Sequence, residues 1–253
     1  MLVAGGGHVP WSVFLWILVC MVSGRTAAMC FNRLVDWEID KENPRTAARH
    51  TLLGKTNAIV IFAVTIAVLI AGTWKLNTLC FYLSPVMVVL ITFYSLTKRF
   101  TAFSHFFLGL ALSVAPMGAW AAVRGDLLTI TPYLLALAVL CWVFGFDLIY
   151  ATLDADFDRR KGLHSFPARF GTQATLRLAR ILHAAAAVAF LLFGLRAGLG
   201  RFYWAAWLVV LGALIWEHRL ADPENPASIN QAFFNVNAWV SMSLLAGVCL
   251  NYL

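Results

Sequence analysis

The chain has 253 residues, of which 61% are hydrophobic and only 12% charged, and its formal net charge is +7. An ordinary soluble domain carries about 25% charged residues, and a water-soluble protein this apolar would expose large hydrophobic patches that promote aggregation. The composition therefore excludes a soluble globular domain and favours a single helical bundle solvated by a lipid bilayer.

Eight apolar stretches follow one another along the chain. A membrane-spanning helix needs roughly 17–25 mostly apolar residues, and backbone groups in lipid must be satisfied within the segment, so these stretches are predicted to be helices. They cover residues 11–31, 57–73, 78–96, 102–123, 130–153, 174–195, 202–217 and 231–251. The sequence thus predicts an all-α, polytopic transmembrane bundle that forms one domain over residues 1–253.

The charged residues are distributed unevenly between the two sides of this predicted bundle. When the loops are assigned to alternating sides, 15 of the 19 basic residues fall on one side, which the positive-inside rule makes cytoplasmic. Eleven of the 12 acidic residues fall on the same side. Since acidic residues contribute little to topology, this second asymmetry needs a chemical explanation.

A first acidic cluster ends the first predicted helix. Asn32, Asp36 and Asp40 stand at i, i+4 and i+8, which places them on one face of a helix predicted to continue through the cluster. Carboxylates so close together repel one another unless a cation lies between them. Carboxylate oxygens, completed by waters and substrate phosphates, are typical of a Mg²⁺ site. We therefore predict these three residues as metal ligands, and Glu38 and Glu42 as solvated surface acids.

A second acidic cluster ends the fifth predicted helix, which is also predicted to be continuous. Asp147, Tyr150, Asp154 and Asp158 stand at i, i+3, i+7 and i+11, again on one face. Asp154 and Asp158 are predicted metal ligands, whereas Asp156 points off the face and its role stays open. Two such faces, brought together by folding, would hold a diphosphate through Mg²⁺ ions that stabilise charge on a leaving group.

A diphosphate also needs cationic partners. Arg25 lies seven residues before Asn32 and therefore nearly on the same face, and other basic residues flank the two acidic clusters. For each of them the alternative is a role in topology or a contact with anionic lipid headgroups. The predicted diphosphate ligands are Arg25, Arg45, Lys98, Arg99, Arg159 and Lys161. The histidines show no ligand spacing, so His105 and His164 are predicted to cap helices or bond at the interface, with substrate contact as the alternative.

Three segments resemble motifs of the UbiA superfamily of intramembrane prenyltransferases. They are N-x-x-x-D-x-x-x-D at residues 32–40, Y-x-x-x-K-R at residues 94–99 and D-x-x-x-D at residues 154–158. The resemblance implies Mg²⁺-dependent ionisation of a polyprenyl diphosphate, followed by attack of the carbocation on an aromatic ring. A carbocation in transit needs a π-rich lining, and Tyr150, near the end of the fifth predicted helix, is predicted to provide it. Asp147 is predicted to orient or deprotonate the acceptor hydroxyl, because it lies about two turns deeper than Asp154 and in register with Tyr150.

Finer features concern the acceptor. Arg33, where the family often has Asp, and the segments NPRTAAR and GLHSFPARFG resemble the 4-hydroxybenzoate polyprenyltransferase-like subgroup linked to menaquinone and the futalosine route. This similarity predicts 1,4-dihydroxy-6-naphthoate as acceptor. The alternatives are 4-hydroxybenzoate of ubiquinone biosynthesis, a haem, a sugar phosphate or glyceryl phosphate, and, from a different class, a cation transporter.

The resemblance also sets expectations for partners, location and length. The expected partners are polyprenyl diphosphate, an aromatic acid acceptor and membrane lipids, with Mg²⁺ as cofactor and no nucleic acid. The expected location is the bacterial inner membrane, with the active site facing the cytoplasm. Because the family has nine helices and eight are seen here, the chain is expected to lack most of the first one.

Overall fold

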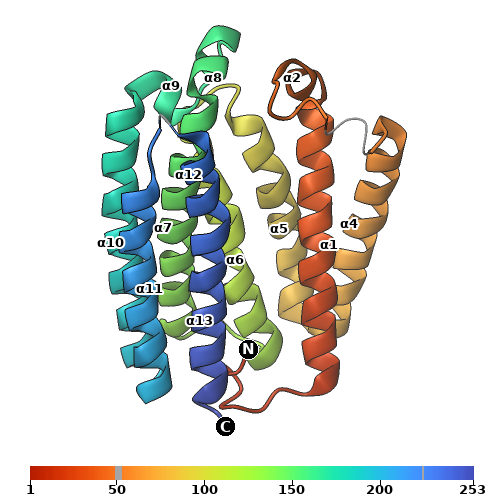
Figure 1. Ribbon diagram of the computed structural model, residues 1–253. Coiled ribbons are helices and arrows are strands. Elements are labelled where there is room, and N and C mark those ends of the chain that lie inside the picture. Colours follow the sequence, from red (N-terminus) through yellow and green to blue (C-terminus); the bar gives the residue numbers. More distant parts are fainter. Residues whose placement is uncertain (49–52, 224) are drawn as a thin grey trace.

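The computed structural model describes residues 1–48, 53–223 and 225–253 and consists of long helices packed side by side (Figure 1). The long helices are α1 (Trp11–Val35), α4 (Lys55–Leu76), α5 (Thr78–Thr97), α6 (Ser104–Arg124), α7 (Thr131–Ala151), α10 (Thr172–Arg196), α11 (Arg201–Leu220) and α13 (Asn237–Leu250). Short helical segments link them: α2 (Trp37–Glu42), η1 (Thr152–Asp154), α8 (Ala155–Lys161), α9 (Phe166–Phe170), α12 (Pro226–Gln231) and the π-helical η2 (Ala232–Val236). Figure 1 shows α2, α8 and α9 at one end of the bundle and both chain termini at the other.

Seven of the described helical segments are long and apolar enough to cross a membrane. The all-α transmembrane fold is therefore confirmed, although the predicted number of spans was eight. The difference is the stretch 202–217, which forms α11. Charged residues near both ends of α11 and its three tryptophans lower its mean hydropathy, yet it packs along α10 and α13 within the bundle.

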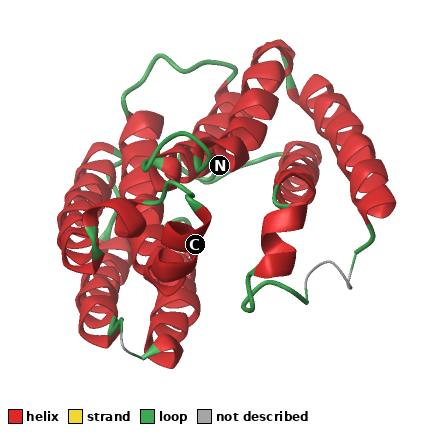
Figure 2. Cartoon of the chain, turned by 90° about the horizontal axis from the view of Figure 1, so that it is seen from above, coloured by secondary structure: helices red, strands yellow, loops and turns green. Residues whose placement is uncertain are grey.

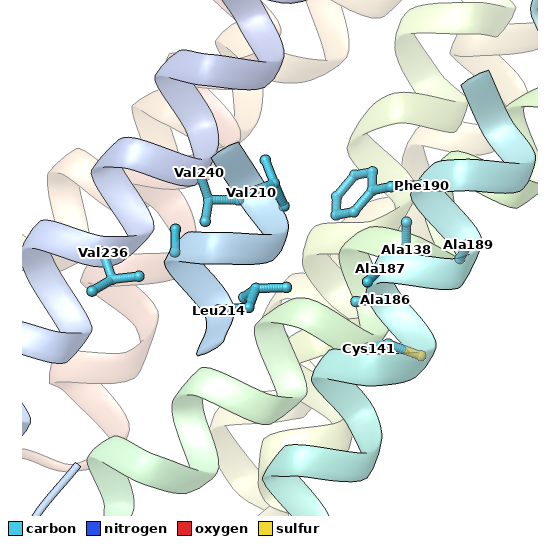
Figure 3. Close-up of a cluster of buried hydrophobic side chains, with 11 residues drawn as sticks. Ala138, Cys141, Ala186, Ala187, Ala189, Phe190, Val210, Leu214, Val236 and Val240 are labelled. Atoms are coloured by element: carbon cyan, nitrogen blue, oxygen red, sulfur yellow. The ribbon is translucent and has the colours of Figure 1, made fainter. Parts of the chain in front are cut away.

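The core consists of two groups of helices joined through α6. Ala27, Leu69, Ile91 and Ala111 bring together α1, α4, α5 and α6. A second cluster joins α7, α10, α11 and α13, and in Figure 3 Phe190 of α10 points toward the aliphatic side chains of the neighbouring helices. Viewed from above, the helices form a horseshoe rather than a single layer (Figure 2). Many large apolar side chains are exposed, as expected for a surface that faces lipid.

Helices α7 and α10 approach each other closely at Gly145. A Cβ atom at this position would lie 2.3 Å from Cδ2 of the buried His183. We expect Gly145→Ala to destabilise the fold by about 1–3 kcal/mol, because overpacking forces neighbours to shift, and to lower the thermal unfolding temperature in detergent. Gly118→Ala on α6 is the matched control, since its Cβ would meet nothing within 4 Å. Equal unfolding temperatures for the two variants would contradict this close packing.

Candidate active site

Both acidic clusters lie where a long helix is interrupted, so the predicted continuous helices were wrong at these points. Helix α1 ends at Val35, and Asp36, with φ −91° and ψ 9°, separates it from α2. Backbone bonds still run from Asp36 N to Asn32 O (2.9 Å) and from Asp40 N to Asp36 O (2.8 Å). The i to i+4 hydrogen bonding within the cluster is therefore kept across the interruption. In the second cluster, the 3₁₀ turn η1 separates α7 from α8.

A cavity of about 250 Å³ lies between the two clusters, at the end of the bundle opposite the termini. Its lining includes all five predicted metal ligands, together with Asp147, Tyr150, Lys98 and Arg45. The five predicted metal ligands are Asn32, Asp36, Asp40, Asp154 and Asp158. The structure thus brings the two acidic clusters to one shared space, while their binding of a metal stays a prediction.

Asp36 is the most deeply buried carboxylate of the cavity, with a side chain only 4% exposed. Its Oδ2 atom accepts from Lys98 Nζ (2.6 Å) and from Asn32 Nδ2 (3.2 Å). Its Oδ1 atom is buried and has no hydrogen-bond partner among the described residues. Burial raises the pKa of this carboxyl above its ordinary value, and Lys98 opposes that shift. Asp36 therefore offers a free oxygen that a cation would satisfy.

Asp154 holds the loop after α2 against the end of α7. Arg45 Nε donates to Asp154 Oδ1 (2.9 Å), a second guanidinium nitrogen contacts Oδ2, and Asn43 Nδ2 also donates to Oδ1 (3.1 Å). Arg45 Nη1 donates to the hydroxyl of Tyr150 (2.7 Å). Arg45 thus lines the cavity as predicted for a diphosphate ligand, but Asp154 and Tyr150 engage its guanidinium group.

The remaining predicted diphosphate ligands lie outside the cavity lining, and Lys98 alone joins Arg45 within it. Arg25 is exposed on α1. Arg99 Nη2 donates to the carbonyl oxygen of Val35 (2.5 Å) at the C-terminal end of α1. A positive charge at this end stabilises a helix, because the helix dipole is negative there. The structure therefore does not place Arg25 or Arg99 at the cavity, and their phosphate roles stay predictions.

Two further predicted ligands form ion pairs at the rim. Arg159 bonds Asp156 (2.8 Å), whose side chain is 80% exposed, and Lys161 pairs with Glu42. Exposed pairs of this kind contribute about 0–1 kcal/mol. Asp156, whose role the sequence left open, thus faces solvent rather than the cavity. Arg49, another basic residue near the first cluster, lies outside the described residues.

His105 lines the cavity, whereas the sequence favoured a capping or interfacial role for it and left substrate contact as the alternative. It lies in the first turn of α6, and its Nδ1 atom lies 2.7 Å from Oδ2 of Asp147. Both side chains line the cavity. No ligand spacing in the sequence marks His105, because its partner lies 42 residues away on another helix. His164, by contrast, is exposed and contributes a backbone bond to the carbonyl of Lys98 (2.8 Å).

The donor set fits a hard divalent cation. Within residues 1–48, 53–223 and 225–253, no three His, Cys, Asp or Glu side chains lie close enough together to hold a metal ion. In the cavity, Lys98 forms an ion pair with Asp36 and Arg45 forms one with Asp154. However, Mg²⁺ typically takes one or two carboxylates and completes its octahedron with waters and substrate phosphates. The unpartnered Oδ1 of Asp36 and the nearby carboxylates meet that requirement.

Fold and site together define an integral membrane protein whose helical bundle holds, at one end, a cavity lined by carboxylates and cations. The sequence matches the UbiA prenyltransferase family over residues 1–240. The chain therefore belongs to this family and is a prenyltransferase, so the predicted family and enzyme class are confirmed. Membership in this family also removes the cation transporter as an explanation.

Relatives and solved structures agree with this assignment. The chain is 30% identical to a 4-hydroxybenzoate octaprenyltransferase from Tolumonas auensis, with 98% of this chain and 86% of the relative aligned. It is 28% identical to the enzyme of that name from Xylella fastidiosa, with 98% and 83% aligned. The apo structure of a UbiA homolog from Aeropyrum pernix K1 has a TM-score of 0.89 at 28% identity, covering 97% of this chain and 92% of the homolog.

A more distant structure carries ligands. It is a UbiA homolog from Archaeoglobus fulgidus bound to GPP and Mg²⁺, with a TM-score of 0.66, 16% identity and coverage of 98% of this chain and 93% of the homolog. At this identity the likeness concerns the fold. The names of the relatives favour the predicted alternative acceptor, 4-hydroxybenzoate, over 1,4-dihydroxy-6-naphthoate.

Proposed function

We propose that this protein transfers a polyprenyl chain from polyprenyl diphosphate to an aromatic hydroxy acid, with 4-hydroxybenzoate as the acceptor. The observation that carries the proposal is the convergence of two acidic clusters and Lys98 on one cavity at the end of an apolar bundle. The names of the relatives support the choice of acceptor. A second candidate acceptor is 1,4-dihydroxy-6-naphthoate, favoured by Arg33 and by the segments at residues 43–49 and 162–171.

In this proposal the diphosphate binds between the two acidic clusters. The proposed Mg²⁺ ligands are Asn32, Asp36, Asp40, Asp154 and Asp158. Mg²⁺ would supply stabilisation of the charge that develops on the leaving diphosphate. Lys98, which lines the cavity and has a side chain 28% exposed, would bind a phosphate oxygen. The prenyl tail would extend among the apolar helices.

Tyr150 is proposed to protect the allylic carbocation. Its ring stacks on Phe233, with centroids 4.1 Å apart, and lines the cavity next to Asp154. The face of an aromatic ring attracts a cation within about 6 Å of its centroid, and the guanidinium of Arg45 already lies 4.9 Å from this ring. A tyrosine in this position would hold the cation while the acceptor ring attacks.

Asp147 is proposed to accept the proton of the acceptor hydroxyl. The allylic C–O bond breaks and its electron pair leaves with the diphosphate. A π electron pair of the ring carbon beside the hydroxyl then forms the new C–C bond as the hydroxyl proton passes to Asp147. The resulting dienone loses its ring proton and regains a hydroxyl proton, so that one proton is released for each transfer.

We further propose that the cavity faces the cytoplasm. Fifteen of the 19 basic residues fall on the side of the acidic clusters in the predicted topology, as the positive-inside rule requires for a cytoplasmic face. Polyprenyl diphosphates and hydroxy acids would then reach the active site from the inner leaflet and the cytosol.

The test is a transfer assay with purified protein in detergent. It would use a polyprenyl diphosphate with either 4-hydroxybenzoate or 1,4-dihydroxy-6-naphthoate, in Mg²⁺ or in excess EDTA. We expect a prenylated 4-hydroxybenzoate that forms in Mg²⁺, disappears in EDTA and returns when Mg²⁺ is restored. Transfer to the naphthoate alone would overturn the acceptor assignment, and activity that persists in EDTA would overturn the metal role.

A further inference from the structure

The contact between His105 and Asp147 joins α6 and α7 in the lining of the cavity. Nδ1 of His105 and Oδ2 of Asp147 are 2.7 Å apart, and the side chains are 9% and 20% exposed. Both residues line the cavity. A charge-assisted hydrogen bond at this distance is short and directional, so it fixes the carboxylate plane relative to the space where substrates bind.

The packing of α6 against α7 makes this contact possible. Gly109 follows His105 by one helical turn and therefore lies on the same face of α6. A Cβ atom at Gly109 would lie only 2.9 Å from the carbonyl oxygen of Leu140. The two backbones thus approach closely just below the pair, which holds His105 within reach of Asp147.

The carboxylate of Asp147 sets the direction of the hydrogen bond. Nε2 of His105 is buried and has no hydrogen-bond partner in the described part of the chain. An ionised carboxylate only accepts hydrogen bonds, so Nδ1, which lies 2.7 Å from Asp147 Oδ2, must be the donor of this contact. The favoured tautomer therefore carries its proton on Nδ1 and donates it to Asp147 Oδ2. The structure gives Asp147 Oδ1 no partner among the described residues, so this oxygen is available to a substrate.

We infer that His105 is a positioning residue that fixes Asp147 so that its free oxygen meets the hydroxyl group of the aromatic acceptor. This inference rests on the proposed function and deepens it. His105 does not touch the reacting atoms, because its remaining nitrogen is buried. Asp147 takes the hydroxyl proton as the ring forms its new C–C bond, and His105 holds the carboxylate in the orientation that this transfer requires.

The substitutions His105→Leu and His105→Asn separate positioning from packing. Asparagine places an amide N–H near the position of Nδ1, whereas leucine fills the space without a donor. We expect His105→Leu to lower kcat for prenyl transfer to 4-hydroxybenzoate on the order of 10²-fold, as small misplacements of a reacting group do. His105→Asn is expected to recover most of that loss, and KM for polyprenyl diphosphate is expected to stay unchanged in both variants.

A double substitution and a control complete the experiment. If His105 acts through Asp147, then His105→Leu lowers kcat no further in the Asp147→Asn background. His164→Leu, at an exposed histidine outside the cavity lining, is expected to keep wild-type kcat. Full turnover by His105→Leu, no rescue by asparagine, or additive losses in the double variant would each overturn the inference. Wild-type transfer, measured in the same series, tests the proposed function separately.

Discussion

Replacing Asp154 by asparagine is expected to lower kcat for prenyl transfer by about 10²–10³-fold, the loss typical when one stabiliser of transition-state charge is removed. Asparagine keeps the shape of the side chain and removes its charge, so the proposed metal loses a carboxylate ligand. Asp154 lines the cavity and accepts bonds from Arg45 and Asn43. A steady-state assay at saturating polyprenyl diphosphate measures the effect directly.

Asp156→Asn is the matched control for this prediction. Asp156 lies two residues away on α8, is 80% exposed and pairs with Arg159 at the surface. Because exposed ion pairs contribute about 0–1 kcal/mol, we expect kcat to stay within about twofold of the wild-type value. Equal losses in the two variants would remove the basis for a metal role of Asp154.

Asp154 also forms an ion pair with Arg45, so a purely structural effect must be distinguished. The discriminating measurement is the Mg²⁺ concentration that gives half-maximal activity. A lost metal ligand raises this concentration, whereas a loosened loop leaves it unchanged and lowers the unfolding temperature instead. An Asp154→Asn variant with unchanged Mg²⁺ dependence would assign Asp154 to the loop rather than to the metal.

Local patterns account for the parts of the fold that the sequence predicted. A helix in lipid satisfies its own backbone, so continuous apolar runs determined the long helices without knowledge of their partners. The regular spacing of Asn32, Asp36 and Asp40 likewise predicted residues that line one cavity. Such periodicity requires only that i and i+4 share a face, and that relation held even where α1 ends.

Contacts between distant segments account for what the sequence missed. The bond between His105 and Asp147 joins residues 42 positions apart, and the bond between Arg45 and Asp154 joins residues 109 positions apart. Neither pair has a spacing that periodicity could reveal. The same reason explains why Arg99, beside Lys98 in the chain, bonds a backbone carbonyl instead of reaching the cavity.

Replacing Lys98 by methionine is expected to lower both stability and activity. Lys98 Nζ lies 2.6 Å from Oδ2 of Asp36, whose side chain is 4% exposed. Removing one partner of a buried, hydrogen-bonded charge pair costs about 2–5 kcal/mol, largely because the other charge stays buried without a partner. Since Lys98 itself is a quarter exposed, we expect a loss near the lower end of that range, measured as a reduced unfolding temperature in detergent.

Two companion variants test whether the charge or its local position matters. Lys98→Arg keeps the positive charge next to Asp36 and is expected to recover most of the stability, although a guanidinium and an ammonium group differ in geometry. Lys161→Met removes a lysine from the exposed pair with Glu42 and is expected to change the unfolding temperature little. If Lys161→Met and Lys98→Met lower the unfolding temperature equally, breaking the buried pair of Lys98 and Asp36 costs no more stability than breaking an exposed pair.

Removing both charges at once separates folding from function. Replacing a buried ion pair by well-packed hydrophobic residues of similar volume is often neutral or stabilising, so Asp36→Leu combined with Lys98→Met is expected to restore the unfolding temperature that Lys98→Met lowers. Activity is expected to stay below that of the wild type, because the double variant lacks both the carboxylate proposed for the metal and the cation proposed for the diphosphate. A double variant that regains turnover along with stability would show that the pair serves the fold and that the chemistry lies elsewhere in the cavity.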